Sequence, residues 1–451
     1  MLPMNIRGGV VLLLLALLLP QPATALDIVS IYELALSNDA RFAADTALYR
    51  AEQQAPTTAR GLLLPELSAS VAGGRVRDER SGGEGFSTGG DATIDGSATF
   101  DSTDFNVQFR QSIYDRQKIL TYRQSKTRAG EADIEFEIAR QNLIIRTVER
   151  YFAVLAAKDN IDLTAANRNA LQRQLELADE RLRVGLGTTT DLFDAQARFS
   201  QAEAEDIEAV NLYQNALQEL AELIGTLPPA PLDRLKPDAP LLYPQPDDID
   251  AWVQRALEYN LELTARRKSE EFALQEIEKE RAGHLPVLDF VVNHTVIDDD
   301  GSISGPGLRR EGTDAMVQLS LPILAGGAIV SRTKEAGFRY QAAQQLTESA
   351  RRSAEQITRS AFLNTITRIR QVEAFGKSVL ASENAVQAKQ DGFEAGLSTN
   401  IDVLDAQRDL FRAQRDHLRS RYDYILNRLD LEAVVGDLDK KDLIQVNIWL
   451  Q

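Results

Sequence analysis

Two long stretches without proline limit the possible folds of this chain more than any other feature of its sequence. Residues 116–184 and 327–395 each run for 69 positions without a proline. As continuous α-helices they would each be about 100 Å long, because a helix rises about 1.5 Å per residue. A compact globular core is much narrower than that. The sequence therefore predicts two extended helical rods.

Two shorter helical segments accompany each rod. Residues 28–61 and 191–224 together supply 68 positions, and residues 248–282 and 402–435 together supply 69. Each pair therefore matches the length of one rod. This match predicts that two short helices stack end to end and pack antiparallel against one long helix, as in a coiled coil.

The sequence contains the same unit twice. Residues 185–225 and 396–436 align without a gap, and eleven of their 41 positions are identical. Earlier in each unit, Leu64-Pro65 corresponds to Leu285-Pro286. The first unit carries about ten extra residues within the glycine-rich stretch 81–101, where we expect an exposed loop. Each unit reads as helix, strand, strand, long helix and helix.

The repeats set the expected organisation of the chain. Residues 1–25 contain Arg7, a run of ten apolar residues and a small-residue ending, which together predict a signal peptide. Seven of the 15 prolines lie between positions 226 and 246, which predicts an irregular connector. We expect the first repeat at residues 26–227, the connector at 228–247, the second repeat at 248–437 and a C-terminal tail at 438–451.

Segments of alternating polarity lie between the helices. A period of two predicts strands that have one apolar and one polar face. A half-buried sheet in a soluble domain shows the same pattern, so the strands alone leave a soluble protein and a membrane protein both open. Weaker partner strands are expected around 67–71 and 288–292. The apolar positions of the stronger strands are Phe105, Val107, Phe109 and Ile113 in the first unit, and Val317, Leu319, Leu321 and Ile323 in the second.

Four amphipathic strands are too few to close a barrel in a membrane. An open sheet would leave backbone N–H and C=O groups without partners in hydrocarbon, at a cost of several kcal/mol each. Closure takes at least eight strands, so two or more chains must contribute. The strand count does not choose between a dimer and a trimer.

Composition excludes several classes of function. The chain carries 50 Lys and Arg against 67 Asp and Glu, a net charge of −17, which disfavours a nucleic-acid partner. It has no cysteine, and its three histidines lie far apart in the sequence. A nucleophile elbow, a zinc-protease motif, a P-loop and a dinucleotide fingerprint are all absent. We therefore expect neither an enzyme nor a metal or cofactor site.

Three kinds of motif accompany the repeat: the two Gly-Leu-x-Thr-x-x-Asp-x-x-Asp-Ala-Gln blocks from Gly185 and Gly396, the Leu-Pro strand openings, and the strand-to-helix junction at 321–327. Together with the repeat, they resemble the TolC family of outer-membrane efflux and type I secretion channels. The resemblance covers essentially the whole mature chain. It implies an α+β membrane protein, a homotrimer whose 12-stranded β-barrel takes four strands from each chain, contacts outer-membrane lipid and continues as a periplasmic α-helical barrel.

The same resemblance implies a function and partners. It implies an outer-membrane exit duct that works with a periplasmic adaptor protein and an inner-membrane ABC or proton-driven transporter. The missing N-terminal cysteine differs from the lipidated branch of the family and favours type I protein secretion over drug efflux. A soluble periplasmic coiled-coil adaptor is the alternative function, although the sequence shows no inner-membrane anchor or lipoyl-like domain for it.

The turns that end the two rods are the first candidate site. Gly185 and Gly396 are expected to end the helices in a left-handed conformation. The resemblance implies that these turns form the periplasmic tip that contacts the adaptor. The tip residues are Val184, Gly185 and Leu186 in the first unit, and Ala395, Gly396 and Leu397 in the second.

Two pairs of aspartates follow these turns and form the second candidate site. Asp191 and Asp194 in the first unit correspond to Asp402 and Asp405 in the second. Aspartates in a first helical turn accept backbone N–H bonds and stabilise the helix, so capping alone would explain them. The resemblance instead implies that Asp402 and Asp405 constrict the tunnel, where carboxylate rings would select cations.

The resemblance also implies a network that holds the tunnel closed. It places a tyrosine and an arginine of that network where this chain has Phe393 and Ser398. The family's interhelical lock is therefore not carried over intact. We expect Arg181 or Arg183 to pair with Asp191 in its place.

Overall fold

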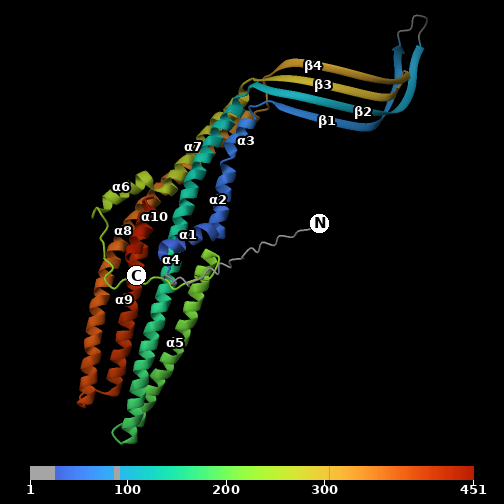
Figure 1. Ribbon diagram of the computed structural model, residues 1–451. Coiled ribbons are helices and arrows are strands. Elements are labelled where there is room, and N and C mark those ends of the chain that lie inside the picture. The colour runs from blue at the N-terminus through green and yellow to red at the C-terminus, as the bar shows by residue number, and fades with distance from the viewer. Residues whose placement is uncertain (1–25, 86–91, 304) are drawn as a thin grey trace, which may run out of the picture.

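The structure, a computed structural model, describes residues 26–85, 92–303 and 305–451. Its helices form one elongated bundle, and four long strands leave one end of that bundle as a single sheet (Figure 1). The predicted signal peptide lies outside the described residues. The described chain is therefore mostly helical with one four-stranded sheet, which confirms the predicted α+β architecture at this level.

The first unit comprises α1 (Ile28–Asn38), α2 (Ala40–Glu52), α3 (Ala55–Gly61), β1 (Glu66–Gly85), β2 (Ala92–Tyr114), α4 (Arg116–Arg183) and α5 (Thr189–Ile224). The second comprises α6 (Ile249–Tyr259), α7 (Leu261–Arg281), the 3₁₀ turn η1 (Ala282–His284), β3 (Val287–Ser302), β4 (Gly305–Ser320), α8 (Ala328–Glu394) and α9 (Asn400–Val434). A last helix, α10 (Lys440–Ile448), follows.

The two predicted rods are α4 and α8, which have 68 and 67 residues. Helices α2 and α3 pack along the sheet-proximal part of α4, and α5 packs along the rest. In the second unit α7 and α9 pack along α8 in the same way. The prediction that short helices stack along each rod is confirmed.

Two of the predicted short helical segments are broken. The side chain of Asp39 accepts hydrogen bonds from the backbone N–H groups of Arg41 and Phe42, at 2.7 and 3.2 Å, and starts α2. Asn260 accepts from the N–H of Leu263 at 2.8 Å and starts α7. An N-cap residue has extended rather than helical backbone, so the chain turns at both positions.

The strands form one antiparallel sheet in the order β1-β2-β3-β4. The register places Phe109 between Leu67 and Val292, so the apolar residues of neighbouring strands share one face. The expected loop at 81–101 is wrong, because β1 continues to Gly85 and β2 begins at Ala92. The extra residues of the first unit therefore lengthen a hairpin.

The second strand prediction also needs a correction at its end. β4 ends at Ser320, so Leu321 and Ile323 lie outside the sheet, and the side chain of Ile323 is 92% exposed. Pro322 has no N–H to donate to a strand partner, which explains why the ladder stops there. Gly326 and Gly327 then take positive φ values of 58° and 82° and turn the chain into α8.

The main hydrophobic core lies where the connector and the C-terminus wrap the middle of the rods. It gathers Leu143, Ile144 and Phe152 of α4 with residues of α1, α5, α9 and α10. The segment expected as a C-terminal tail is helical here and buries Leu443 and Val446. The connector joins this core through backbone bonds from Leu26 and from the chain end.

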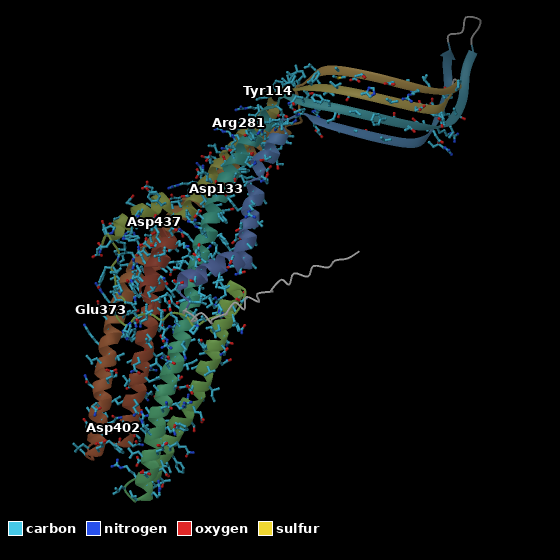
Figure 2. The ribbon with its side chains drawn as sticks, viewed as in Figure 1. Tyr114, Asp133, Arg281, Glu373, Asp402 and Asp437 are labelled. Atoms are coloured by element: carbon cyan, nitrogen blue, oxygen red, sulfur yellow. The ribbon has the colours of Figure 1, made fainter. Side chains whose placement is uncertain are left out.

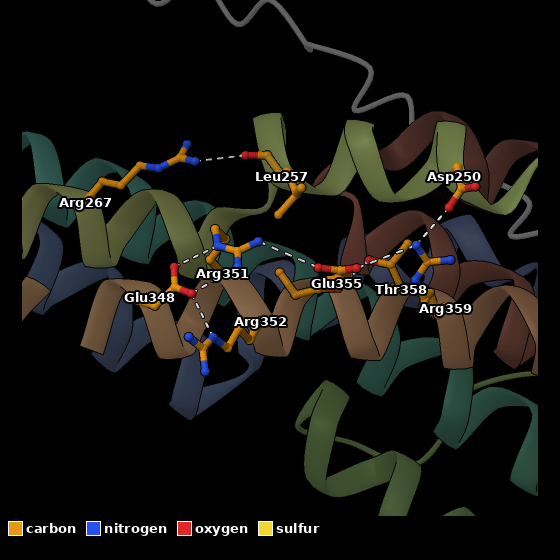
Figure 3. Close-up of polar contacts among 10 residues, drawn as sticks. Asp250, Leu257, Arg267, Glu348, Arg351, Arg352, Glu355, Thr358 and Arg359 are labelled. Carbon is orange, nitrogen blue, oxygen red and sulfur yellow. Dashed lines mark hydrogen bonds and ion pairs between the residues drawn. The ribbon is translucent and has the colours of Figure 1, made fainter. Parts of the chain in front are cut away.

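A row of charged pairs runs along α8 and fastens α6 to it (Figure 3). Arg359 binds Asp250 of α6 at 2.8 Å, and it also lies 3.6 Å from Glu355. Hydrogen bonds from Arg351 and Arg352 lower the pKa of Glu348 to about 2. Exposed pairs of this kind stabilise a protein only weakly. The buried side chain of Trp252 in α6 therefore contributes more to the attachment of α6 to α8.

A substitution at Tyr151 tests how strongly the connector is held to the core. Its buried hydroxyl lies 3.1 Å from the carbonyl of Leu26 and 2.9 Å from that of Asp233. Tyr151→Phe should lower the free energy of unfolding by about 1–2 kcal/mol, because it removes a buried hydroxyl donor from two partly buried carbonyl groups. The measurement is thermal unfolding of the purified protein in detergent.

Tyr213→Phe is the matched control. Tyr213 contacts the same core and has no hydrogen-bond partner among the described residues. Its substitution should change the free energy of unfolding by no more than about 0.5 kcal/mol. Equal effects of the two substitutions would show that the Tyr151 hydroxyl does not secure the connector.

Candidate functional site

Both rods end in glycine turns at the end of the bundle that is farthest from the sheet (Figure 1). Gly185 and Gly396 have φ values of 77° and 75°, as predicted for residues that end a helix. Leu186 donates its N–H to the carbonyl of Arg181 at 2.8 Å, and Leu397 donates to Gly392 at 2.7 Å. The two turns therefore have the same backbone conformation and the same hydrogen-bond pattern.

Each turn exposes large apolar side chains. Leu186 and Leu397 are 75% and 85% exposed, and Val184 is exposed beside them. Side chains of this kind at a helix turn provide apolar area for contact with another protein. The six predicted tip residues therefore lie together on two neighbouring turns.

The first aspartate of each pair belongs to a capping box. Thr399 donates its N–H and its hydroxyl to Asp402, at 2.9 and 2.7 Å, and accepts the N–H of Asp402 at 3.2 Å. Thr188 and Asp191 make the same three bonds. The capping interpretation is confirmed for Asp191 and Asp402.

Asp402 differs from Asp191 in its charge environment. The side chain of Lys389 donates to Asp402 at 3.1 Å. The bonds from Thr399, together with Lys389, lower the pKa of Asp402 to about 2. Asp402 is thus ionised at any physiological pH. Figure 2 shows Asp402 near the tip of its hairpin, at the opposite end of the rods from Tyr114.

The second aspartate of each pair does not cap its helix. Asp405 is an ion-pair partner of both Arg198 and Arg408, each at 3.1 Å. Asp194 is half-buried and has no side-chain partner among the described residues. The structure thus brings together Asp402 and Asp405 with three cationic groups, whereas Asp191 and Asp194 have no cationic partner in the part of the chain that the structure describes.

Three contacts that involve polar or charged side chains link the two hairpins near their tips within the described residues. Arg198 of α5 binds Asp405 of α9, and Asn400 donates to the backbone carbonyl of Asp191 at 3.4 Å. The guanidinium of Arg181 lies 4.3 Å from the ring centre of Phe393 on α8. A cation is attracted to the face of an aromatic ring. Phe393 therefore takes part in this contact through its ring, although it lacks the hydroxyl of the tyrosine expected at this position.

The expected pairing of Arg181 or Arg183 with Asp191 is wrong. Arg181 stacks on Phe393 instead. Arg183 lies 3.5 Å from Asp179 and 3.4 Å from Glu180 on its own helix. The carboxylate of Asp191 instead accepts a hydrogen bond from Thr188, one turn away, as part of the helix cap.

The polar face of the sheet carries a second set of linked side chains. Arg110 binds the buried Asp289 at 2.5 Å, and Gln108 donates to Asn293 at 3.0 Å. Asn293 in turn donates to Asp314 of β4 at 3.1 Å. These bonds join three strands across the face opposite to Phe109 and Val292. The period-two pattern predicted a polar face but could not identify these pairs.

Among the described residues, no group of three or more histidines, aspartates or glutamates is placed to hold a metal ion. Within the same residues, no helix is both long enough and apolar enough to cross a bilayer.

Comparison with known proteins agrees with this geometry. The chain is 31% identical over 429 residues to the outer membrane protein TolC of Vibrio cholerae, covering 94% of each chain. It is 31% identical over 432 residues to the alkaline protease secretion protein AprF of Pseudomonas aeruginosa, covering 95% of this chain and 88% of AprF. Its fold matches the CmeC outer membrane channel of Campylobacter jejuni with a TM-score of 0.74, at 16% identity, over 94% and 90% of the two chains.

The family described as outer membrane efflux protein matches residues 31–226 and 252–437. This result excludes the alternative of a soluble periplasmic adaptor, because the matching family and the TolC relative are described as outer membrane proteins. The predicted outer-membrane location and exit-duct function are both confirmed. The chain belongs to the outer membrane efflux protein family and is an outer-membrane exit duct for secretion or efflux.

Proposed function

We propose that three copies of this chain form the duct, with a 12-stranded barrel in the outer membrane that continues as a helical tunnel through the periplasm. The observation that carries this proposal is the sheet, which is open at both edges, β1 and β4, and has one apolar face. Three sheets of four strands meet the requirement for a closed barrel of even strand number. In this assembly the apolar face contacts lipid, and the face with Arg110 and Asp289 lines water.

The duct then works with a periplasmic adaptor and an inner-membrane transporter. The relatives named for alkaline protease secretion and for proteases secretion support protein export as one use of such a duct. The apolar residues Leu186 and Leu397 at the tips supply a contact surface for the adaptor. The absence of cysteine favours the unlipidated secretion branch over drug efflux.

Asp402 and Asp405 act as the selective constriction in this proposal. Threefold symmetry would gather six carboxylates at the tunnel end, and such rings attract cations. Asp402 keeps its charge because its pKa is about 2. Arg198 and Arg408 offset the charge of Asp405, so its carboxylate contributes most when these pairs separate.

A charge placed on each face in turn tests the barrel. Val107→Arg should make the free energy of membrane insertion less favourable by about 2–4 kcal/mol, because it puts a cation on the lipid face near the bilayer midplane. Gln108→Arg is the matched control, since the neighbouring side chain points to the opposite face. The amount of trimer in the outer-membrane fraction measures both. Equal tolerance of the two substitutions would contradict the barrel.

Substitution of a tip glycine tests the adaptor contact. Gly396→Val should abolish export and leave the trimer assembled, because a β-branched side chain is strained at a φ of 75° in this exposed turn. Gly130→Val is the control, since Gly130 lies in α4 with open space around it. Secreted protein in the medium and resistance to efflux substrates measure export. Normal export by Gly396→Val would remove the tip from the site.

The aspartates are tested by ion selectivity in planar bilayers. Asp402→Ala combined with Asp405→Ala should lower the preference for cations and weaken block by trivalent cations, with little change in trimer stability. In the unsubstituted channel the preference should persist as the pH falls towards 4, because the depressed pKa of about 2 keeps Asp402 ionised.

The equivalent first-repeat variant, Asp191→Ala combined with Asp194→Ala, is the control for the loss of a cap. It removes the same capping box and should affect selectivity less. If the Asp402 and Asp405 variant keeps its selectivity and only loses stability, the two aspartates have a structural role alone and the constriction lies elsewhere.

A further inference from the structure

We infer that neighbouring copies join β4 to β1 in one fixed register, in which Ser320 lies opposite Ser70 of the partner subunit. This inference rests on the proposed trimer and specifies the residue pairs of its interface. It follows from the internal repeat, because the chain already contains one example of such a join. That example is the pairing of β2, the last strand of the first unit, with β3, the first strand of the second.

The two hairpins of the chain are aligned in the same way at their helical ends. β1 begins at Glu66, which pairs with Arg110 of β2. β3 begins at Val287, which pairs with Ser320 of β4. Arg110 and Ser320 are therefore equivalent positions in the two units, although the hairpins differ in length at their far ends.

The pairing of β2 with β3 shows by how many residues one hairpin is displaced along the strands relative to the next. Arg110 pairs with Val291, which is the fifth residue of β3. The same step between chains sets Ser320 opposite the fifth residue of the next β1, the partner's Ser70. The antiparallel ladder then pairs Leu319 with the partner's Val71, Gln318 with the partner's Ala72, Val317 with the partner's Gly73, and Met316 with the partner's Gly74.

This register matches the polarity of the two edges. Leu319 and Val71 lie on the apolar face, and in one chain they are 66% and 69% exposed. The repeat alone places them opposite each other, and their matching polarity is an independent agreement. A shift by one residue would turn every apolar side chain of one strand to the polar face of the other.

The sizes of the side chains also fit. β1 carries two consecutive glycines, Gly73 and Gly74, and a Cβ placed on either would have no atom within 4 Å. The inferred register sets Val317 and Met316, both exposed in one chain, opposite these two positions. A glycine inside a strand often marks a close approach of another group, so the larger side chains can lie across the glycines.

The same interface between subunits continues along the helices. Within the chain α4 packs against both α7 and α9. The repeat equates α4 with α8, so α8 should pack against α3 and α5 of the partner subunit. Lys334, Phe338 and Ala342 lie on one exposed face of α8, and Phe338 is 69% exposed. Ile207 of α5 is equally exposed. In the ring, the neighbour on one side would cover the face of α8, and the neighbour on the other side would cover the face of α5.

Disulfide trapping tests the register, and the natural chain has no cysteine to interfere. Gln318→Cys is combined in turn with Ala72→Cys, with Ser70→Cys and with Gly74→Cys, and each protein is oxidised in outer membranes. The first combination should give covalent dimers and trimers on non-reducing gels several-fold faster than the other two. Directly opposite Cβ atoms are about 4.5–5.5 Å apart, and diagonal neighbours about 7–8 Å.

Two controls separate the register from the assembly. Gln108→Cys with Asn293→Cys should close within one chain, because these residues are hydrogen-bonded neighbours at 3.0 Å. Sedimentation of the unmodified protein in detergent reports the trimer without any cross-link. A trimer whose fastest pair is a different one, or in which none of the three pairs reacts, would overturn the register and leave the assembly standing. A protein that sediments as a monomer would overturn both.

Discussion

The unpaired edges of the sheet are the constraint on which the rest of the structure depends. β1 and β4 each leave a row of backbone groups without partners in the chain. In hydrocarbon each such group would cost several kcal/mol, so the barrel that we propose needs more than one copy of the chain to close. The internal repeat supplies the solution, because a chain that joins β2 to β3 can join β4 to another β1 by the same geometry. A duct built this way needs only one kind of interface, repeated around an axis.

The rods extend this arrangement away from the membrane. β2 passes into α4 through the single residue Asp115, whose side chain caps the helix. β4 reaches α8 through a longer junction that turns on Gly326 and Gly327. The two units therefore share a plan but differ at the point where sheet becomes helix. The core around Phe152 and Tyr151 fixes the middle of the rods, while both tips remain apart from it.

The tips combine a structural and a chemical role in the same residues. The capping boxes of Asp191 and Asp402 are alike, so capping cannot distinguish the two units. Their surroundings do, because Lys389 donates to Asp402, and Arg198 binds Asp405 across to the other hairpin. In the proposed duct, the links between hairpins and the charge at the constriction therefore involve the same side chain. Separating the hairpins would take Arg198 away from Asp405 and leave it paired with Arg408 of its own helix alone.

The sequence by itself determined the rods, the strand faces and the caps, because helix length, period-two alternation and capping depend on residues that are close in the chain. It did not reveal the break at Asp39, since an aspartate can cap a helix or lie within one. It also missed α10, which is too short to carry a clear period. Only the tertiary structure decided that Arg198 binds Asp405 and that Arg181 stacks on Phe393, because those partners are about two hundred residues apart and meet only when the two hairpins lie side by side.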